Sequence, residues 1–356
     1  MNFRTILLGV SLIFSLETYS AEVAPKIDIS IDSYNYSQAK YINDYIGSFS
    51  GVLKNGDHAV SLNKLSFDIN YNHLNFGLFK RLDYVHSFSS DTATLHHNIK
   101  NNLTPNSPQT YQLNLRMEHI EASGIKLGYE WQIQQNIAFS LTGNYFLGVN
   151  FHTGELEGHA EWSSDDELQV FAPSVVYSAK NELLQYPKTN SNGKGYSFDL
   201  GFNWQPREYW RVELQANDAI SQISWKKATA NQINRWKTHQ TDSTGRLDAT
   251  PVLEGRILDY EQKLIQSYKG TINFEKDNGY EYFSTLLHNK FFSHHQLGLK
   301  KHLENDRTLI FAWHRDINAF QIGLSTPFAD IKFTTDSISS KKRHFFNLSM
   351  GMSYVF

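Results

Sequence analysis

The C-terminal stretch from Arg343 to Phe356 constrains the fold of this chain more than any other feature. Its alternate positions from residue 346 onward are apolar, and the positions between them are almost all small or polar. Because successive side chains of a strand point to opposite faces, this pattern predicts a strand with one wholly apolar face. A soluble edge strand seldom keeps such a face up to an aromatic last residue. The alternate positions in question are Phe346, Leu348, Met350, Met352, Tyr354 and Phe356.

This ending resembles the last strand of bacterial outer-membrane β-barrel proteins. In that class the final strand ends on Phe after alternating apolar or aromatic residues, and the barrel assembly machinery reads this ending. The resemblance implies an all-β fold: a closed antiparallel up-and-down transmembrane β-barrel in the outer membrane. It also implies contact with outer-membrane lipid and lipopolysaccharide, and with the assembly machinery as a partner. The residues of the implied assembly signal are Leu348, Met350, Met352, Tyr354 and Phe356.

The first residues have the features of a secretory signal peptide. Arg4 supplies the positive charge, residues 6–16 form an apolar run, and Thr18 to Ser20 offer small residues for cleavage. The apolar run is shorter than the about 20 residues that a membrane-spanning helix needs. We therefore predict a signal peptide at 1–20 and one outer-membrane β-barrel domain at 21–356.

The composition excludes several classes of function. The chain has no cysteine, so disulfides, thiol chemistry and lipid anchoring at an N-terminal cysteine are excluded. With 33 basic and 36 acidic residues the net charge is -3, and nothing indicates a nucleic-acid partner. Aromatic residues make up 14% of the chain, which suits the aromatic girdles of a membrane barrel.

Alternating patterns recur along the chain and predict about 16 strands, with 14 to 18 open, at roughly 10 residues each plus connections. The clearest hairpin is expected at 196–217, and long polar loops are expected at 89–110, 181–194 and 226–255. Residues 36–47 fit either a strand or a short helix. One inconsistency remains, because this strand order puts the loop at 89–110 on the periplasmic side. We expect the error to lie at 111–131, which could form a single long strand.

Charged residues of both signs fall on the polar faces of the predicted strands. A charge is tolerated in a water-filled lumen, whereas Arg or Lys on the lipid face costs about 2–4 kcal/mol at the membrane midplane. We therefore expect these charges to point inward, where they either line an aqueous pore or form ladders that fill the lumen. The candidates are Asp68, Arg116, Glu118, Lys126, Glu130, Asp199, Arg211 and Glu213.

The sequence shows no Gly-x-Ser-x-Gly elbow and no spacing typical of a metal site, although it contains 15 histidines. We therefore predict neither catalysis nor a cofactor or metal. The leading hypothesis is a porin-like channel for small polar solutes. The first alternative is a non-conducting structural or assembly barrel whose loops near Asn181 and Lys226 meet a surface partner. A weaker alternative is an outer-membrane lipid-modifying enzyme.

Overall fold

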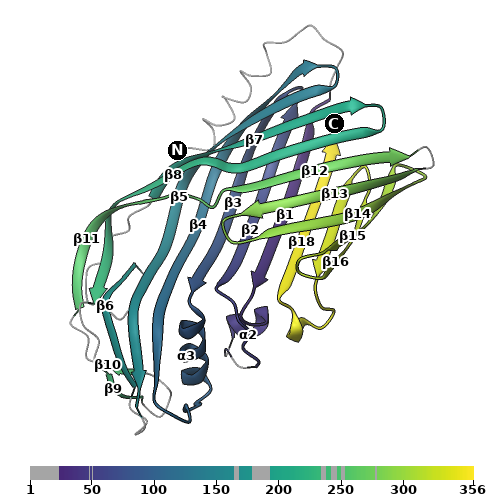
Figure 1. Ribbon diagram of the computed structural model, residues 1–356. Helices are drawn as coiled ribbons and strands as arrows, with labels where there is room; N and C mark the ends of the chain where they lie inside the picture. Colours follow the sequence, from purple (N-terminus) through teal and green to yellow (C-terminus); the bar gives the residue numbers. More distant parts are fainter. Residues whose placement is uncertain are drawn as a thin grey trace.

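The chain forms a β-barrel of steeply inclined strands (Figure 1). The computed structural model describes residues 24–47, 49, 51–163, 168–178, 193–233, 238–241, 247–249, 253–276 and 279–356. The predicted signal peptide lies outside these residues. The elements are β1 (Lys26–Ser37), α2 (Ile42–Ile46), β2 (His58–Tyr71), β3 (Leu74–Phe88), α3 (Ser90–Lys100), β4 (Gln109–Gln134), β5 (Ile137–Trp162), β6 (Leu168–Ser178), β7 (Gly193–Arg207), β8 (Trp210–Ile233), β9 (Thr238–Thr241), β10 (Leu247–Ala249), β11 (Leu253–Gln262), β12 (Ser267–Lys276), β13 (Tyr280–Asn289), β14 (Ser293–Leu303), β15 (Arg307–His314), β16 (Ala319–Ser325), β17 (Ala329–Thr335), the 3-10 turn η1 (Ser340–Lys342) and β18 (Phe345–Val355).

Fourteen strands close into an antiparallel ring, in the order β1 to β5, β7, β8 and β12 to β18. The ring closes where β18 pairs with β1, with Tyr354 opposite Ile27 and Phe346 opposite Asn35. Closure leaves no unpaired strand edge within the ring, which is what a lipid environment requires. The predicted closed antiparallel barrel is confirmed, and the strand number is the lowest of the predicted range.

Two places in the wall are each occupied by two consecutive strands. Along β5, β7 pairs with the part up to Val149, and β6 pairs with the part from Thr153 to Trp162. Along β8, β12 pairs with Trp210 to Asn217, and β11 pairs with Ile223 to Ile233. The wall around β5 and β8 is therefore much taller than the wall of short strands from β12 to β17 (Figure 1).

The two ends of the barrel differ in their connections. The turns at the end that carries Phe356 are short, as between β2 and β3, whereas α2 and α3 lie at the opposite end (Figure 1). Outer-membrane barrels have short periplasmic turns and longer extracellular loops. The end with α2 and α3 is therefore the extracellular end. Among the described residues, no helix has the length and apolar character needed to cross a membrane.

The structure settles the loop inconsistency and corrects two loop predictions. β4 runs unbroken through residues 111–131, so the loop at 89–110 is extracellular. This loop is not irregular, because it contains α3. Residues 226–255 are not one irregular stretch either, since β8 continues to Ile233 and β11 begins at Leu253, while most of 181–194 lies outside the described residues. The open segment 36–47 holds the end of β1 and the short helix α2.

Local sequence explains where α3 begins and ends. The Ser89 hydroxyl accepts a hydrogen bond from the Thr92 amide at 3.1 Å, which satisfies one of the free amides of the first turn. Asp91 lies in the first turn and Lys100 in the last, so both charges complement the helix dipole. Ala93 and Leu95 are buried against the barrel wall.

The outward faces of the strands are apolar and exposed over a continuous band. Ile31 of β1, Leu78 of β3 and Leu127 of β4 are 44%, 50% and 61% exposed. Exposed apolar side chains on this scale are costly in water but are the normal surface of a barrel in lipid. The outer surface of the ring is therefore a lipid-facing surface.

Apolar side chains form clusters inside the barrel. One apolar cluster joins β3, β4, β5 and β8, and Trp225 and Ile223 are fully buried in it. A second cluster joins Val60 and Val85, on β2 and β3, to Ile265 in the connection between β11 and β12. Because β12 lies nearly opposite β2 in the ring, Ile265 reaches across the lumen.

Candidate functional site

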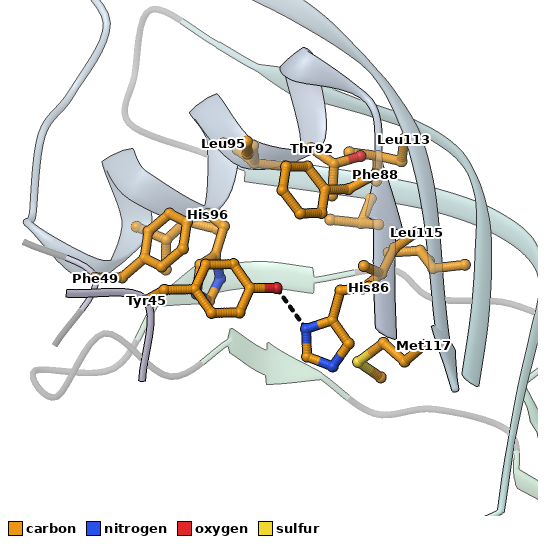
Figure 2. A pocket seen from close by; sticks show the side chains of 14 residues that line it. Tyr45, Phe49, His86, Phe88, Thr92, Leu95, His96, Leu113, Leu115 and Met117 are labelled. Atoms are coloured by element: carbon orange, nitrogen blue, oxygen red, sulfur yellow. Dashed lines mark hydrogen bonds between the residues drawn. The ribbon is translucent and has the colours of Figure 1, made fainter. Parts of the chain in front are cut away.

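An apolar cavity of about 340 Å³ lies between α3, the segment after α2 and the extracellular part of the wall (Figure 2). We call it the outer cavity. Most side chains that line it are aliphatic or aromatic, and the polar ones are Tyr45, His86, Thr92 and His96. Its residues are Tyr45, Phe49, His86, Phe88, Thr92, Ala93, Leu95, His96, Ile99, Leu113, Leu115, Met117, Leu156 and Val170.

The outer cavity lies on the outward face of the wall rather than in the lumen. Strands β3 and β4 pair without a register shift, with Leu78 opposite Ile125 and Phe88 opposite Leu115. Leu78 and Phe88 are an even number of residues apart, so both point to the same face. Leu78 is in the lipid-facing band, and Phe88 is buried by α3 and its neighbours. The helices α2 and α3 therefore cover the outside of the barrel where its wall rises above the membrane.

A chain of hydrogen bonds includes two of the polar side chains that line the cavity. The Tyr45 hydroxyl contacts Nδ1 of His86, as Figure 2 shows, and Nε2 of His86 lies 2.5 Å from Nε2 of His119. Burial raises the pKa of the Tyr45 hydroxyl, so the phenol stays protonated and donates to His86. A neutral His86 then carries its proton on Nε2 and donates it to His119. The ring of Tyr84 packs edge-to-face against that of His119, with the two ring centres 4.5 Å apart.

The segment after α2 is fastened to α3 by a buried lysine. Nζ of Lys40 donates to the Gly51 carbonyl at 2.7 Å and lies 3.0 Å from Nδ1 of His97. The ammonium also lies 5.1 Å from the centre of the Phe49 ring, within the range of a cation–π contact. Phe49 in turn packs edge-on against His96 at 4.6 Å. These contacts hold the wall of the cavity that comes from the first extracellular loop.

A second cavity, of about 410 Å³, adjoins the first on the same face of the wall. We call it the membrane-side cavity, because its β3 residues Leu82 and Tyr84 lie between the lipid-facing Leu78 and the outer cavity. Tyr45 and His86 line both cavities, so their hydrogen bond forms the partition between them.

The charges predicted to face the lumen lie on the face opposite the exposed apolar residues, and six of them form ion pairs within the set. Asp68 pairs with Lys126 at 2.8 Å, Arg116 with Glu118 at 2.8 Å, and Arg211 with Glu213 at 2.9 Å. Asp199 accepts a hydrogen bond from Asn144 at 2.9 Å and from the Asp218 amide at 2.7 Å, and Glu130 is half-buried near the end of β4.

Two further features were not predicted from the sequence. Arg81 pairs with Asp83 and with Asp218, and all three side chains are almost fully buried. Lys80 interrupts the outward apolar face of β3, where it points outward and pairs with the exposed Glu121 at 3.1 Å. The adjacent cations Lys80 and Arg81 were the signal in the sequence for a buried charge, since adjacent strand residues point to opposite faces and one of the two must face inward.

The outer cavity was also not predicted from the sequence. Phe88, Leu113 and Leu115 continue the outward apolar pattern past the membrane, which was the signal for a covering element. Within the ranges that the structure describes, no three His, Asp or Glu side chains are placed to hold a metal ion.

The closed ring and its lipid-facing outer band define an outer-membrane β-barrel protein. Residues of the predicted assembly signal contribute to this band, with Met352 and Phe356 at 65% and 64% exposure. Within this class, the chain belongs to the family of unknown function DUF5723, whose model matches residues 27–356.

Several solved structures have a similar arrangement of strands. They include a deletion mutant of the monoaromatic hydrocarbon channel TodX, with 10% identity and a TM-score of 0.49 over 94% of this chain and 91% of that chain. A FadL homologue of Pseudomonas aeruginosa has 10% identity and a TM-score of 0.35 over 93% and 88%. The translocator domain of the autotransporter NalP from Neisseria meningitidis has 9% identity and a TM-score of 0.35 over 99% and 96%. No curated protein matches by sequence, and the likeness concerns the fold alone.

Proposed function

We propose that the protein is an outer-membrane channel for small hydrophobic molecules, which it takes up from the outside through the outer cavity. The observation that carries the proposal is this apolar cavity of about 340 Å³, which falls within the size range of ligand pockets. Its mostly apolar lining, with only four polar side chains, suits a molecule that is apolar over most of its surface. The proposal replaces polar solutes, predicted from the sequence, by hydrophobic ones. It contains no catalytic step.

Filling the cavity is expected to abolish this binding. In Leu113→Trp the indole enters the space that a ligand would occupy, because Leu113 is only 6% exposed and lines the cavity. We expect the Kd for the apolar fluorophore N-phenyl-1-naphthylamine to rise at least about tenfold, the effect of losing 1.4 kcal/mol of binding free energy. The measurement is a fluorescence titration of the protein in nanodiscs, with empty nanodiscs as the blank.

Leu127→Trp is the matched control for this substitution. It changes the same residue type on the same face of β4, but Leu127 lies in the lipid-facing band. Its affinity for the fluorophore should stay at the wild-type value. Equal affinities for wild type and both variants would exclude the outer cavity as the binding site.

We further propose that small polar solutes do not pass, because side chains occupy the lumen at two levels. The Glu281 carboxylate forms ion pairs with Lys300 at 2.6 Å and with Arg211 at 3.2 Å, which adds to the paired charges on the inner face of the wall. Above them, the apolar contacts of Ile265 with Val60 and Val85 cross the lumen. Planar-bilayer recordings of the refolded protein should therefore show no steady ionic conductance. A reproducible open-channel current would contradict a closed lumen and restore the polar-solute hypothesis.

A further inference from the structure

We propose that the hydrophobic molecule travels along the outside of the barrel wall, from the outer cavity through the Tyr45–His86 partition into the membrane-side cavity and then into the lipid bilayer. The lumen is not part of this route. The inference rests on the proposed function, because it takes the outer cavity as the place where the molecule binds first.

The order of the lining residues along β3 supports this route. On its outward face, Phe88 lines the outer cavity, His86 lines both cavities, and Tyr84 and Leu82 line the membrane-side cavity. Leu78, one step beyond Lys80 on the same face, is in the lipid-facing band. At about 3.4 Å per residue, the two cavities span most of the distance from the outer loops to the bilayer. A molecule would therefore cross this zone in two steps.

The zone that the cavities span is polar on its outer surface. Ser33 donates to Asn63 at 2.6 Å, and Ser61 donates to Asn35 at 2.7 Å, both on the outward faces of β1 and β2. Lys80 and Glu121 form an exposed ion pair at the same level of the wall. A hydrophobic molecule has to cross this layer to reach the lipid. Since the polar groups bond to one another, the membrane-side cavity beside them can still receive an apolar guest.

A larger cavity of about 1100 Å³ lies beside the connection between β11 and β12, but charged side chains such as Arg116, Glu118 and Glu261 line it, so it suits an apolar molecule less well than the two outer cavities. Phe79, Phe146 and Trp225 meet inside the wall and are at most 6% exposed. Charged groups lie on both sides of Phe79 along β3: Asp68 with Lys126 toward the periplasmic end, and the buried Arg81 with its two carboxylates toward the extracellular end. An apolar molecule passing these charged groups would displace solvent and ion-pair contacts without replacing them.

The Tyr45–His86 hydrogen bond sets the barrier between the cavities. A molecule that passes the partition has to break this hydrogen bond. Tyr45→Phe removes the donor hydroxyl and keeps the ring, so we expect the molecule to pass about 2–10-fold faster, the factor that corresponds to one ordinary hydrogen bond.

The test measures transfer into the membrane and binding in the same variants. Transfer is the rate at which N-phenyl-1-naphthylamine fluorescence rises in cells that carry the protein in an intact outer membrane. Ser61→Trp places an indole in the membrane-side cavity, whereas Ser123→Trp makes the same change on the outward face of β4, away from both cavities. Leu264→Ala widens the lumen cluster instead. Heat-modifiable migration in gels checks that each variant is folded.

The expected result is that Ser61→Trp loses at least about 80% of the protein-dependent rate, the effect of one kcal/mol on a barrier. It should bind the fluorophore in nanodiscs with the wild-type Kd. Ser123→Trp and Leu264→Ala should transfer at the wild-type rate. A wild-type rate in folded Ser61→Trp, or a faster rate in Leu264→Ala, would overturn the outer route. Absence of binding in the wild-type protein would instead refute the proposed function.

Discussion

Arg81→Met is expected to lower the free energy of unfolding by about 3–5 kcal/mol, the largest effect of any single change considered. The guanidinium contacts the carboxylates of Asp83 and Asp218, whose side chains are only 6% and 8% exposed. Removing the cation leaves two buried carboxylates close together without the ion pairs that both form with Arg81. Reversible denaturant unfolding in lipid vesicles, followed by tryptophan fluorescence, measures the loss.

Two further variants separate burial from charge. Lys80→Met removes the neighbouring cation of β3, whose ion pair with Glu121 is exposed, so its cost should stay below about 1 kcal/mol. Combining Arg81→Met with Asp83→Asn and Asp218→Asn removes both unpaired charges and should restore most of the lost stability. Asn is suited to position 218, because the backbone there has a positive φ of 53°. A small effect of Arg81→Met alone would show that water reaches this site.

Met350→Arg is expected to destabilise the folded barrel by about 2–4 kcal/mol, the cost of a cation near the midplane of the bilayer. Met350 pairs with Ile31 on one side and Ile331 on the other, and all three point into the lipid-facing band. The new charge would therefore replace an apolar side chain at the centre of an apolar surface. The same unfolding experiment in vesicles measures this effect.

Phe356→Asp is the informative comparison for Met350→Arg. Phe356 lies at the periplasmic end, where its amide donates to the Pro25 carbonyl at 3.2 Å, and a charge at the interface costs only about 0–1 kcal/mol. If Phe356 belongs to the assembly signal, this variant should refold in vitro but reach the outer membrane of cells poorly. Normal outer-membrane levels together with poor refolding would show that the residue acts on stability and not on assembly.

The barrel could be predicted because a strand in a membrane wall repeats one simple pattern. From Phe346 to Phe356 every second residue faces lipid, and the hairpin at 196–217 repeats the same alternation, so class and closure follow from the sequence. The strand count was less certain, because strands of this barrel vary from 7 residues in β16 to 26 in β4. Alternation does not show where a long strand leaves the membrane.

The outer cavity could not be predicted because it depends on contacts between distant segments. Lys40 and Phe49 reach α3 from the first loop, and Leu113 and Val170 reach it from two strands of the tall wall. The polar residues of 89–110 read as a loop, although Ser89 and Asp91 are a sound helix start. Alternation indicates which face of a strand a charged residue occupies, but its ion-pair partner depends on the register between strands, which the sequence does not show.

The connection between β11 and β12 is hydrogen-bonded to the barrel wall and also supplies a side chain that crosses the lumen. The Leu264 amide donates to the Ser221 hydroxyl at 2.9 Å, and Gln266 donates to the Ala219 carbonyl at 2.7 Å, while Ile265 between them reaches the far side. Ile265 therefore cannot leave the lumen independently of the wall. Moving it aside would break the hydrogen bonds that join this connection to β8, so any opening of the lumen at this point would also open a gap between neighbouring strands.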